Sequence, residues 1–363
     1  FFLVFKKFSG VWIMAYTTID NSVLHFQTKA YTGDGNDDRN IVFDVTDTTM
    51  QPDFLWSARR DSGDNLSIYD SVRGDGKELR TAETGSQYDR TNNIQALQSN
   101  GFQVGSDGQV NASGGTYVSW AFKAGNSSGS SNGDGSISST VTANTTAGFS
   151  IVKYTGTGSN ATVGHGLGAV PQVTIIKGIT NSYNWGVYHH KLGNQKNLNL
   201  NTSGAANNDS GGVYYNSTTP TSTVFSIGTN VGYNASSADY IAYCFVEKQG
   251  YSKFGSYTGN GNADGTYVHL GFRPAWIMIK RSDSSGNWFI HDNKRVTFNV
   301  DNKYLAANDA AAEQTFTALD MLSNGFKLRT SGTGYNASSG TYTYYAFAES
   351  PFVNSSSVPN NAR

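Results

Sequence analysis

The sequence of 363 residues contains one cysteine, six prolines and little charge. The single cysteine, Cys244, excludes an intramolecular disulfide framework and any metal site built from several cysteines, and we interpret it as a small buried hydrophobic residue. Charged residues make up 15 % of the chain, the formal net charge is −1, and no local run of lysine or arginine occurs. The basic face that a nucleic-acid backbone requires is therefore missing. No stretch reaches the ~18 apolar residues of a transmembrane helix, so we expect no membrane partner.

Aromatic residues and glycine are abundant instead. The chain has 20 Phe, 21 Tyr, 6 Trp and 41 Gly, although its hydrophobic fraction is only 37 %. Aromatic side chains bury a large area each, and glycine-rich turns between short aromatic segments are typical of strands rather than helices. A chain of this length suits two to four domains.

One cassette occurs three times, at residues 111–122 (NASGGTYVSWAF), 234–245 (NASSADYIAYCF) and 336–347 (NASSGTYTYYAF). In each copy a polar turn leads into an aromatic strand. A second repeated motif, Tyr-Thr-Gly-x-Gly-x, begins at Tyr31, Tyr154 and Tyr257, and the first cassette tyrosine follows 86, 86 and 85 residues later. This spacing indicates three copies of one unit of roughly 95–100 residues, the size of a small domain.

Each copy also has a proline before a strand-like run, at Pro52, Pro171 and Pro274, and Gly, Asn or Asp turns at short intervals. This pattern predicts an all-β chain of three tandem antiparallel β-sandwich domains of jelly-roll or lectin-like type. The cassette is interpreted as a central strand buried on both sides. The expected boundaries are an N-terminal extension and lead-in (1–30), repeat 1 (31–125), a Gly/Ser-rich linker (126–147), repeat 2 (148–250), repeat 3 (251–353) and a flexible tail (354–363).

The connecting segments carry further expectations. The linker composition predicts a mobile joint between repeats 1 and 2, with an extra strand within 136–146, and a tight joint between repeats 2 and 3. Residues 305–321 contain the one helix-like run, for one or two turns. The apolar run before Lys6 and Lys7 has the reverse order of a secretory signal, and we interpret Met14 as the natural start.

The search for catalytic motifs finds no Walker loop, zinc-binding HExxH or GxSxG elbow, and no acidic position recurs in all three copies. We therefore predict no enzymatic activity and no cofactor. His189 and His190 are adjacent on a strand and should point to opposite faces, which favours a structural role over metal binding. The acidic loops of repeat 1 lack the regular order of a calcium loop, so we interpret them as solvated turns, with an adventitious or stabilising Ca²⁺ as the alternative. These acidic residues are Asp34, Asp37, Asp38, Asp61, Asp64, Asp70 and Asp75.

The Asn-Ala-Ser turns at Asn111, Asn234 and Asn336 are interpreted as turn chemistry, in which asparagine adopts the left-handed conformation and caps the turn locally. Aromatic residues in polar loops are typical of saccharide sites and adaptable contact surfaces. The candidate binding residues near turns are Tyr183, Trp185, Tyr214, Tyr215 and Trp288, although Trp185 and Trp288 align within the repeat and a core position is the alternative for them.

Several segments together resemble a known family. They are MAYTTID (14–20), FQTK (26–29), DSVRG (70–74), SNGF (99–102), YVSWAFKAG (117–125), YSKFGSYTG (251–259) and the Tyr-Thr-Gly-x-Gly-x motifs. Over about residues 14–353 the chain resembles a tandem domain of unknown function found in tailed bacteriophages, notably marine ones, and usually described as a tail fibre or virion structural protein. The first copy departs from this pattern at 40–46, and the Gly/Ser linker is an insertion.

The resemblance implies a non-enzymatic virion appendage at the particle surface that binds other virion proteins or host surface polysaccharide through its loops. Similar parts are commonly homotrimers. The alternatives are a capsid decoration or head-fibre protein, and a free carbohydrate-binding module or glycan-active enzyme. Since a feature repeated in every copy serves the fold, we expect mutation of Tyr344 to impair folding, and we expect binding to depend on the loops 61–76, 207–219 and 283–287, where the copies differ.

Overall fold

The computed structural model describes residues 5–8, 11–14, 16–45 and 48–351 of the chain. Strands account for 44 % of the residues and helices for 4 %, which confirms the all-β fold class. Near the start of the chain, β1 (Phe5–Phe8) and β2 (Val11–Met14) form a hairpin, and η1 (Ser22–Leu24) follows. The tail predicted at 354–363 lies outside the described residues.

Unit 1 (residues 26–122) forms two antiparallel sheets, of order β3-β11-β5-β6-β7-β8 and β4-β10-β9. Its strands are β3 (Phe26–Thr32), β4 (Arg39–Val42), β5 (Phe54–Arg59), β6 (Ser67–Asp70), β7 (Lys77–Arg80), β8 (Tyr88–Asp89), β9 (Ile94–Gln98), β10 (Gly101–Val104) and β11 (Thr116–Phe122), with α1 (Gly108–Asn111) before the last strand. One buried cluster takes residues from both sheets, among them Leu55, Phe102 and Ala121, so the two sheets pack as a sandwich.

Unit 2 (residues 130–245) repeats this order with two strands added at one edge, β12-β13-β14-β21-β16-β17-β18-β19, and a small sheet β15-β20. Its strands are β12 (Ser130–Asn132), β13 (Ser139–Asn144), β14 (Phe149–Thr155), β15 (Ala161–Gly164), β16 (Val173–Gly178), β17 (Gly186–His189), β18 (Lys196–Asn199), β19 (Asn207–Asn208), β20 (Val224–Ile227) and β21 (Asp239–Phe245), with α2 (Val231–Asn234).

Unit 3 (residues 252–351) joins its strands into one continuous sheet, β22-β29-β24-β25-β26-β27-β28-β23. The strands are β22 (Ser252–Thr258), β23 (Tyr267–His269), β24 (Phe272–Arg281), β25 (Trp288–Asp292), β26 (Asp301–Ala306), β27 (Gln314–Leu322), β28 (Gly325–Leu328) and β29 (Thr341–Pro351), with α3 (Thr333–Asn336). In every unit the cassette strand lies between the opening strand and the strand that follows or contains the repeated proline, namely β5, β16 or β24. The prediction of a central cassette strand is confirmed.

The two repeated motifs contact each other in all three units. The opening tyrosine stacks on the cassette tyrosine at 5.1 Å for Tyr31–Tyr117, 5.3 Å for Tyr154–Tyr240 and 4.9 Å for Tyr257–Tyr342, with interplanar angles of 20°, 17° and 8°. The cassette tyrosine also accepts a hydrogen bond from the alanine amide of its own turn, at 2.8, 2.8 and 2.7 Å. This shared packing explains why the two motifs keep a constant separation in the sequence.

The cassette asparagines do not act as local turn caps. Each is fully buried, and its amide holds the backbone of the distant Tyr-Thr-Gly-x-Gly-x loop. Asn336, for example, accepts a hydrogen bond from the Asn260 amide and donates to the Asn262 carbonyl, both at 2.8 Å. The left-handed positions in two of these turns are Ser237 and Ser339. The expectation was wrong because a buried amide must find partners, and the opening loop supplies them.

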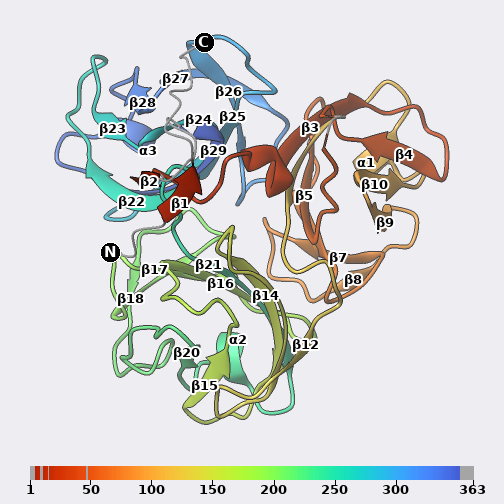
Figure 1. Cartoon of the computed structure of the whole chain (residues 1–363), viewed down its shortest axis with the longest axis vertical. Coiled ribbons are helices and arrows are strands. Elements are labelled where there is room, and N and C mark those ends of the chain that lie inside the picture. The colour runs from red at the N-terminus through yellow and green to blue at the C-terminus, as the bar shows by residue number, and fades with distance from the viewer. Residues whose placement is uncertain (1–4, 9–10, 15, 46–47, 352–363) are drawn as a thin grey trace.

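The three units share one core instead of following one another as separate domains. The largest buried cluster takes aromatic residues from all three, and the rings of Phe122, Phe245 and Phe347 meet at its centre, 4.8–6.1 Å apart. Figure 1 shows the units as three lobes around this point. The cavity enclosed there is about 30 Å³, so side chains fill the centre and leave no room for a ligand there.

Two local expectations differ from the structure. The stretch 126–147, expected as a linker, contains β12 and β13, which extend the sheet of unit 2; the extra strand expected within 136–146 corresponds to β13. The helix-like run at 305–321 forms β26, a turn and β27. Here the tertiary pairing of β26 with β27 and β27 with β28 overrides the helical propensity of the alanines.

Candidate functional site

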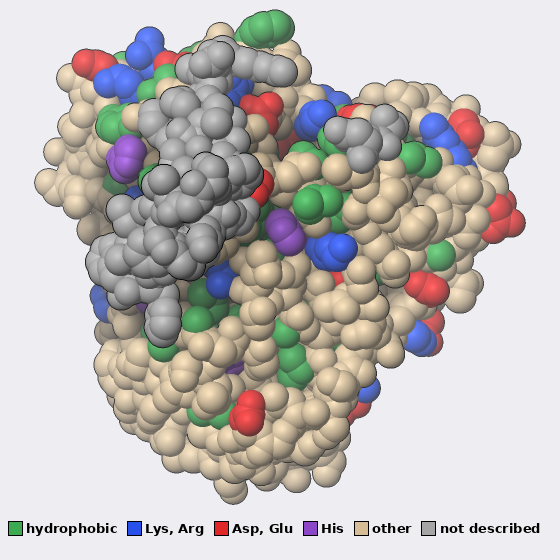
Figure 2. Space-filling view, viewed as in Figure 1, with side chains coloured by type: hydrophobic (Ala, Val, Ile, Leu, Met, Phe, Trp, Pro, Cys, Tyr) green, Lys and Arg blue, Asp and Glu red, His purple; other side chains and the backbone are tan. Residues whose placement is uncertain are grey.

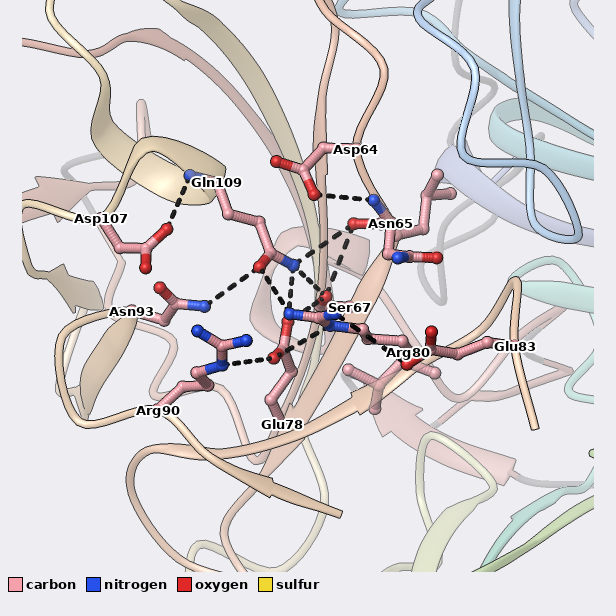
Figure 3. A network of polar contacts seen from close by, with 12 residues as sticks. Asp64, Asn65, Ser67, Glu78, Arg80, Glu83, Arg90, Asn93, Asp107 and Gln109 are labelled. Carbon is pink, nitrogen blue, oxygen red and sulfur yellow. Dashed lines mark hydrogen bonds and ion pairs between the residues drawn. The ribbon is translucent and has the colours of Figure 1, made fainter. Parts of the chain in front are cut away.

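A network of charged and amide side chains lies where β6 and β7 of unit 1 meet α1 (Figure 3). Glu78 on β7 is at its centre and is fully buried. One carboxylate oxygen, Oε1, accepts hydrogen bonds from Ser67 Oγ (2.6 Å) and from the amide of Gln109. A buried carboxylate is tolerated only when such partners surround it, so this site is a strongly constrained part of the unit.

Two arginines neutralise the other oxygen of Glu78. Oε2 lies 3.2 Å from Arg80 Nε and 3.8 Å from Arg90 Nε. Burial alone would lower the pKa of Arg80, but the attraction of Glu78 outweighs it and the pKa is raised. The same guanidinium groups lie over the ring of Tyr88, at 4.6 Å for Arg80 and 5.9 Å for Arg90. Glu83 accepts a hydrogen bond from the Tyr88 hydroxyl, which, together with partial burial, raises the pKa of that tyrosine.

Two aspartates and a tyrosine complete the network. Asp64 accepts a hydrogen bond from the backbone N–H of Asn65 at 2.9 Å. Asp107 caps α1 by accepting one from the backbone N–H of Gln109, also at 2.9 Å. Burial, followed by repulsion from Asp107 and Glu78, raises the pKa of Asp64. Burial also raises the pKa of Tyr69 well above its usual value.

The same place in units 2 and 3 holds different chemistry. Strand register makes Asn197 the counterpart of Glu78, and its amide oxygen accepts hydrogen bonds from the hydroxyls of Tyr215 (2.6 Å) and Tyr233. In unit 3, His291 lies 2.9 Å from the Tyr335 hydroxyl through Nε2 and 3.3 Å from Asp301 through Nδ1. The polar centre therefore repeats in position but is acidic, neutral or histidine-based according to the unit.

The contacts of Glu78 decide what the network can do. Oε1 accepts two hydrogen bonds, and Oε2 has two arginines within ion-pair distance but no hydrogen-bond partner among the described residues. The surrounding side chains come from β6, β7, α1 and the segment after β8, and they bury the carboxylate completely. A general acid or nucleophile needs an oxygen that can approach a substrate atom. The geometry instead makes Glu78 an anchor that holds α1 and the segment around Arg90 against the sheet.

The aromatic candidates from the sequence fall into two groups. Trp185 and Trp288 are fully buried and donate their indole N–H groups to the carbonyls of Arg80 and Asn199 in the neighbouring unit, both at 2.9 Å. Tyr215 is buried in the polar centre of unit 2. These three predicted binding residues cannot reach a surface ligand, because a neighbouring unit covers the two tryptophans and the core of unit 2 covers Tyr215. Tyr214 is half-buried, and Tyr183 is 42 % exposed.

The remaining candidates occupy structural positions. His189 is buried, which lowers its pKa to about 3, and His190 Nε2 lies 2.7 Å from the Phe254 carbonyl oxygen. Both face the junction of units 2 and 3, as a structural role would require. Cys244 is fully buried, and burial raises its pKa to about 12.

Three of the acidic residues singled out in unit 1 pair with arginine, and in one of these pairs Asp34 Oδ2 lies 3.4 Å from Arg39 Nε. Asp61 lies 3.0 Å from Arg59, and Asp70 forms a buried ion pair with Arg73. In the described part of the chain, no three His, Cys, Asp or Glu side chains are placed to hold a metal ion. Among the same residues, no helix has the length and apolar character to cross a membrane.

Sequence reasoning missed Glu78, Arg80 and Gln109. The available signal was a charged residue inside a strand, Lys77–Arg80, at a position where the other copies carry Asn197 or Tyr304. A charge in a strand is common on exposed faces, so only the packing of α1 identifies this one as buried.

Comparison with known proteins places the chain in a family but gives no activity. No curated protein matches it, and no solved structure matches it. Residues 21–351 match one family, which covers both the shared core and the polar centre. The chain belongs to the family described as "Domain of unknown function (DUF7483)".

Proposed function

We propose that this chain is a non-enzymatic structural protein of a tailed bacteriophage particle, where it serves as a tail fibre or appendage. Its exposed loops contact host surface glycans or other virion proteins. The proposal joins the resemblance of the repeat motifs to phage virion proteins with the architecture of the three units. Its location is the particle surface, and the homotrimer typical of similar proteins stays a prediction that a mass measurement in solution tests.

The observation that carries the proposal is the closure of the three units around one core. Equivalent backbone hydrogen bonds join each pair of units: Gln87 to the Ile179 carbonyl, Ala206 to the Ser282 carbonyl and Glu313 to the Arg60 carbonyl, at 2.9 Å in every case. The lead-in also reaches unit 3, since the Tyr16 hydroxyl donates to the Gly271 carbonyl at 3.0 Å. Such a closed body resists separation of its units, which suits a part displayed outside the cell.

The surface and the polar centre support a binding role over catalysis. In the view of Figure 2, side chains of both charge signs are interspersed over the described surface. In the polar centre of unit 1 the ionisable groups pair with one another. Glu78 pairs with Arg80 and Arg90, and Tyr88 bonds Glu83. A protein that presents loops on a rigid body needs no reactive group.

Labelling of intact particles tests the location. Antibodies against the purified chain, imaged by electron microscopy on the phage that encodes it, should decorate the tail tip or fibres. Decoration of the capsid would instead establish the head-fibre alternative, and the absence of the chain from purified particles would overturn the virion assignment.

A glycan array combined with an assay for released reducing sugar tests the mode of action. Binding without turnover is expected. Release of reducing sugar by the wild-type protein would overturn the non-enzymatic assignment.

A further inference from the structure

The three junctions between units are structurally equivalent, but each is occupied differently. At each one, the segment that follows β6, β17 or β25 and the end of the cassette strand of the same unit face the opening strand, or the segment before it, of the next unit. Register places Ser71, His190 and Asn293 in equivalent positions, and likewise Val72, Lys191 and Lys294. A comparison of the three can therefore separate what the fold requires from what one junction adds.

The junction of units 1 and 2 is filled by the chain itself. Asp53 accepts hydrogen bonds from the amides of Ala124 (2.8 Å) and Asn126 (3.0 Å). Ser71 donates to the Ser127 carbonyl at 3.0 Å. The segment that leads to β12 thus lies in the space that the other junctions leave open.

The junction of units 3 and 1 holds a cavity of about 530 Å³ whose charges neutralise one another. Asp44 lies between Lys29 and Lys294, the latter at 3.5 Å, and Arg273 Nε lies 2.6 Å from Glu349. Lys294 and Arg273, which line this cavity, are therefore already paired with carboxylates.

The junction of units 2 and 3 leaves a polar groove of about 630 Å³, within the ~300–1,000 Å³ range of small-ligand sites. Its walls include Gln172 and Lys191 from unit 2, Glu247 and Gln249 from the segment that connects units 2 and 3, and Lys253 and Tyr344 from unit 3. Among the described residues, Lys191, Lys253 and Glu247 form no ion pair. This junction alone combines open space with lysines that have no carboxylate partner.

Tyr344 gives the groove a buried polar group. Its side chain is only 4 % exposed and packs on Phe326, and no hydrogen bond of its hydroxyl to a described residue is present. The hydroxyl lies over Gly255 on the edge strand β22, where a Cβ atom would come within 2.3 Å of it. The equivalent cassette residues are Ser119 and Ala242, so the large side chain and the glycine that admits it occur together only in unit 3.

The charges indicate the class of ligand. Lys191 of unit 2 and Lys253 of unit 3 both line the groove, and an ammonium group attracts a carboxylate; Glu247 and the two glutamine amides offer acceptors and donors for hydroxyl groups. One hydrogen of the Lys253 ammonium is donated to the His269 carbonyl at 2.9 Å, and an ammonium group has three donors. One acidic group flanked by hydroxyl groups is the pattern of a uronic-acid sugar.

We propose that this groove binds an acidic saccharide unit, with its carboxylate between Lys191 and Lys253 and a ring hydroxyl on the hydroxyl of Tyr344. The assignment rests on the proposed contact with host surface glycans and names its ligand. It also gives Tyr344 a part in binding in addition to the folding role expected from the sequence.

Calorimetric titration with two probes tests the assignment: a tetramer of galacturonic acid and the matching neutral tetramer of galactose. The acidic tetramer should bind at least about tenfold more tightly, since its carboxylates can form ionic hydrogen bonds that the neutral tetramer lacks. Lys191→Met should weaken binding of the acidic tetramer about tenfold or more. Tyr344→Phe, which keeps the ring and the fold, should weaken it about fivefold, in line with one neutral hydrogen bond.

The matched control is Lys294→Met, which changes the equivalent lysine of the 3–1 junction and should bind like the wild type. The groove assignment is overturned if the acidic tetramer fails to bind, or if Lys191→Met and Tyr344→Phe bind it as the wild type does. Neither result touches the virion assignment, which depends on the labelling of particles.

Discussion

The junctions between units share their backbone hydrogen bonds. They differ in the side chain that contacts the aromatic residue of the cassette strand. Trp120, Tyr243 and Tyr345 occupy the same cassette position, and each contacts a neighbouring unit: unit 3, unit 1 and unit 2, respectively. Trp120 donates to Asp292 at 3.0 Å, and Tyr243 donates to Asp70 at 2.7 Å. The third, Tyr345, meets His189, with the two rings in edge contact at 5.1 Å.

The two aspartate junctions are complete buried networks. Asp70 pairs with Arg73 and Asp292 with Arg295, and all four side chains are at most 1 % exposed. Burial alone would raise the pKa of Asp292, but Arg295 outweighs it and the pKa is lowered. Each pair also receives the aromatic donor of another unit, so the charge is held by contacts from both sides of the junction.

The histidine junction leaves polar atoms without partners. His189 Nδ1 accepts a hydrogen bond from the Lys191 amide at 3.2 Å, and Leu192 stands where the other units carry Arg73 and Arg295. Among the described residues, neither His189 Nε2 nor the Tyr345 hydroxyl has a hydrogen-bond partner. The comparison teaches that packing and backbone hydrogen bonds are enough to join two units, because a buried ion pair is present at only two of the three junctions. The incomplete junction is also the one with the open groove.

The largest effect is expected from Asp70→Ala. Removing the aspartate leaves Arg73 buried without its carboxylate, which costs about 3–5 kcal/mol of unfolding free energy. The equivalent change in the histidine junction, His189→Ala, removes no charge and should cost roughly 1–2 kcal/mol as a lost packing contact. Urea unfolding followed by tryptophan fluorescence measures both, and equal losses would contradict the distinction between the junctions.

Acid should weaken the histidine junction. His189 has a folded-state pKa near 3, below its ordinary value of 6.5, so between these pH values the unfolded chain binds a proton that the folded chain does not. The unfolding free energy therefore falls as the pH drops through this window, by at most about 1.4 kcal/mol per pH unit from this group.

His189→Leu removes that contribution and keeps an apolar side chain at the site. Its unfolding free energy, measured from pH 7 to pH 4, should fall less steeply than that of the wild type. Parallel curves for the two proteins would show that His189 does not titrate in this way.

The smallest effects compare two hydroxyl groups. Tyr243→Phe removes the donor to buried Asp70 and should cost about 1–2 kcal/mol of unfolding free energy. Tyr345→Phe removes a hydroxyl that has no partner among the described residues and should be neutral or stabilising by a few tenths of a kcal/mol. Thermal unfolding of the two variants measures both changes. A larger loss of unfolding free energy for Tyr345→Phe than for Tyr243→Phe would contradict the comparison.

Much of the fold could be predicted from the sequence because the same motifs occur in three copies. The spacing of Tyr31 to Tyr117 and its two counterparts marks strands that pair, and the alternation of the cassette marks a strand with two buried faces. The binding candidates were less predictable. Trp185 and Trp288 lie beside polar turns in the sequence, but their exposure depends on the neighbouring unit, which covers both.

The candidate sites depend still more on tertiary contacts. Glu78, Arg90 and Gln109 are far apart in the chain and meet only because α1 packs on β6 and β7. The groove between units 2 and 3 likewise depends on which residues stand at a junction, and no local pattern marks Lys191 and Lys253 as neighbours.

By itself, the sequence determined that the chain is all-β and built from a threefold repeat with a central aromatic strand, because strand alternation and turn chemistry act between near neighbours and repeat with each copy. It also determined the pairing of the opening and cassette motifs, since both recur at a fixed separation. Only the tertiary structure decided that the units close around one core and are not separate domains in a row. That outcome depends on which faces of the sheets bury their aromatics against other units, a free-energy balance set by long-range contacts that local propensity does not record.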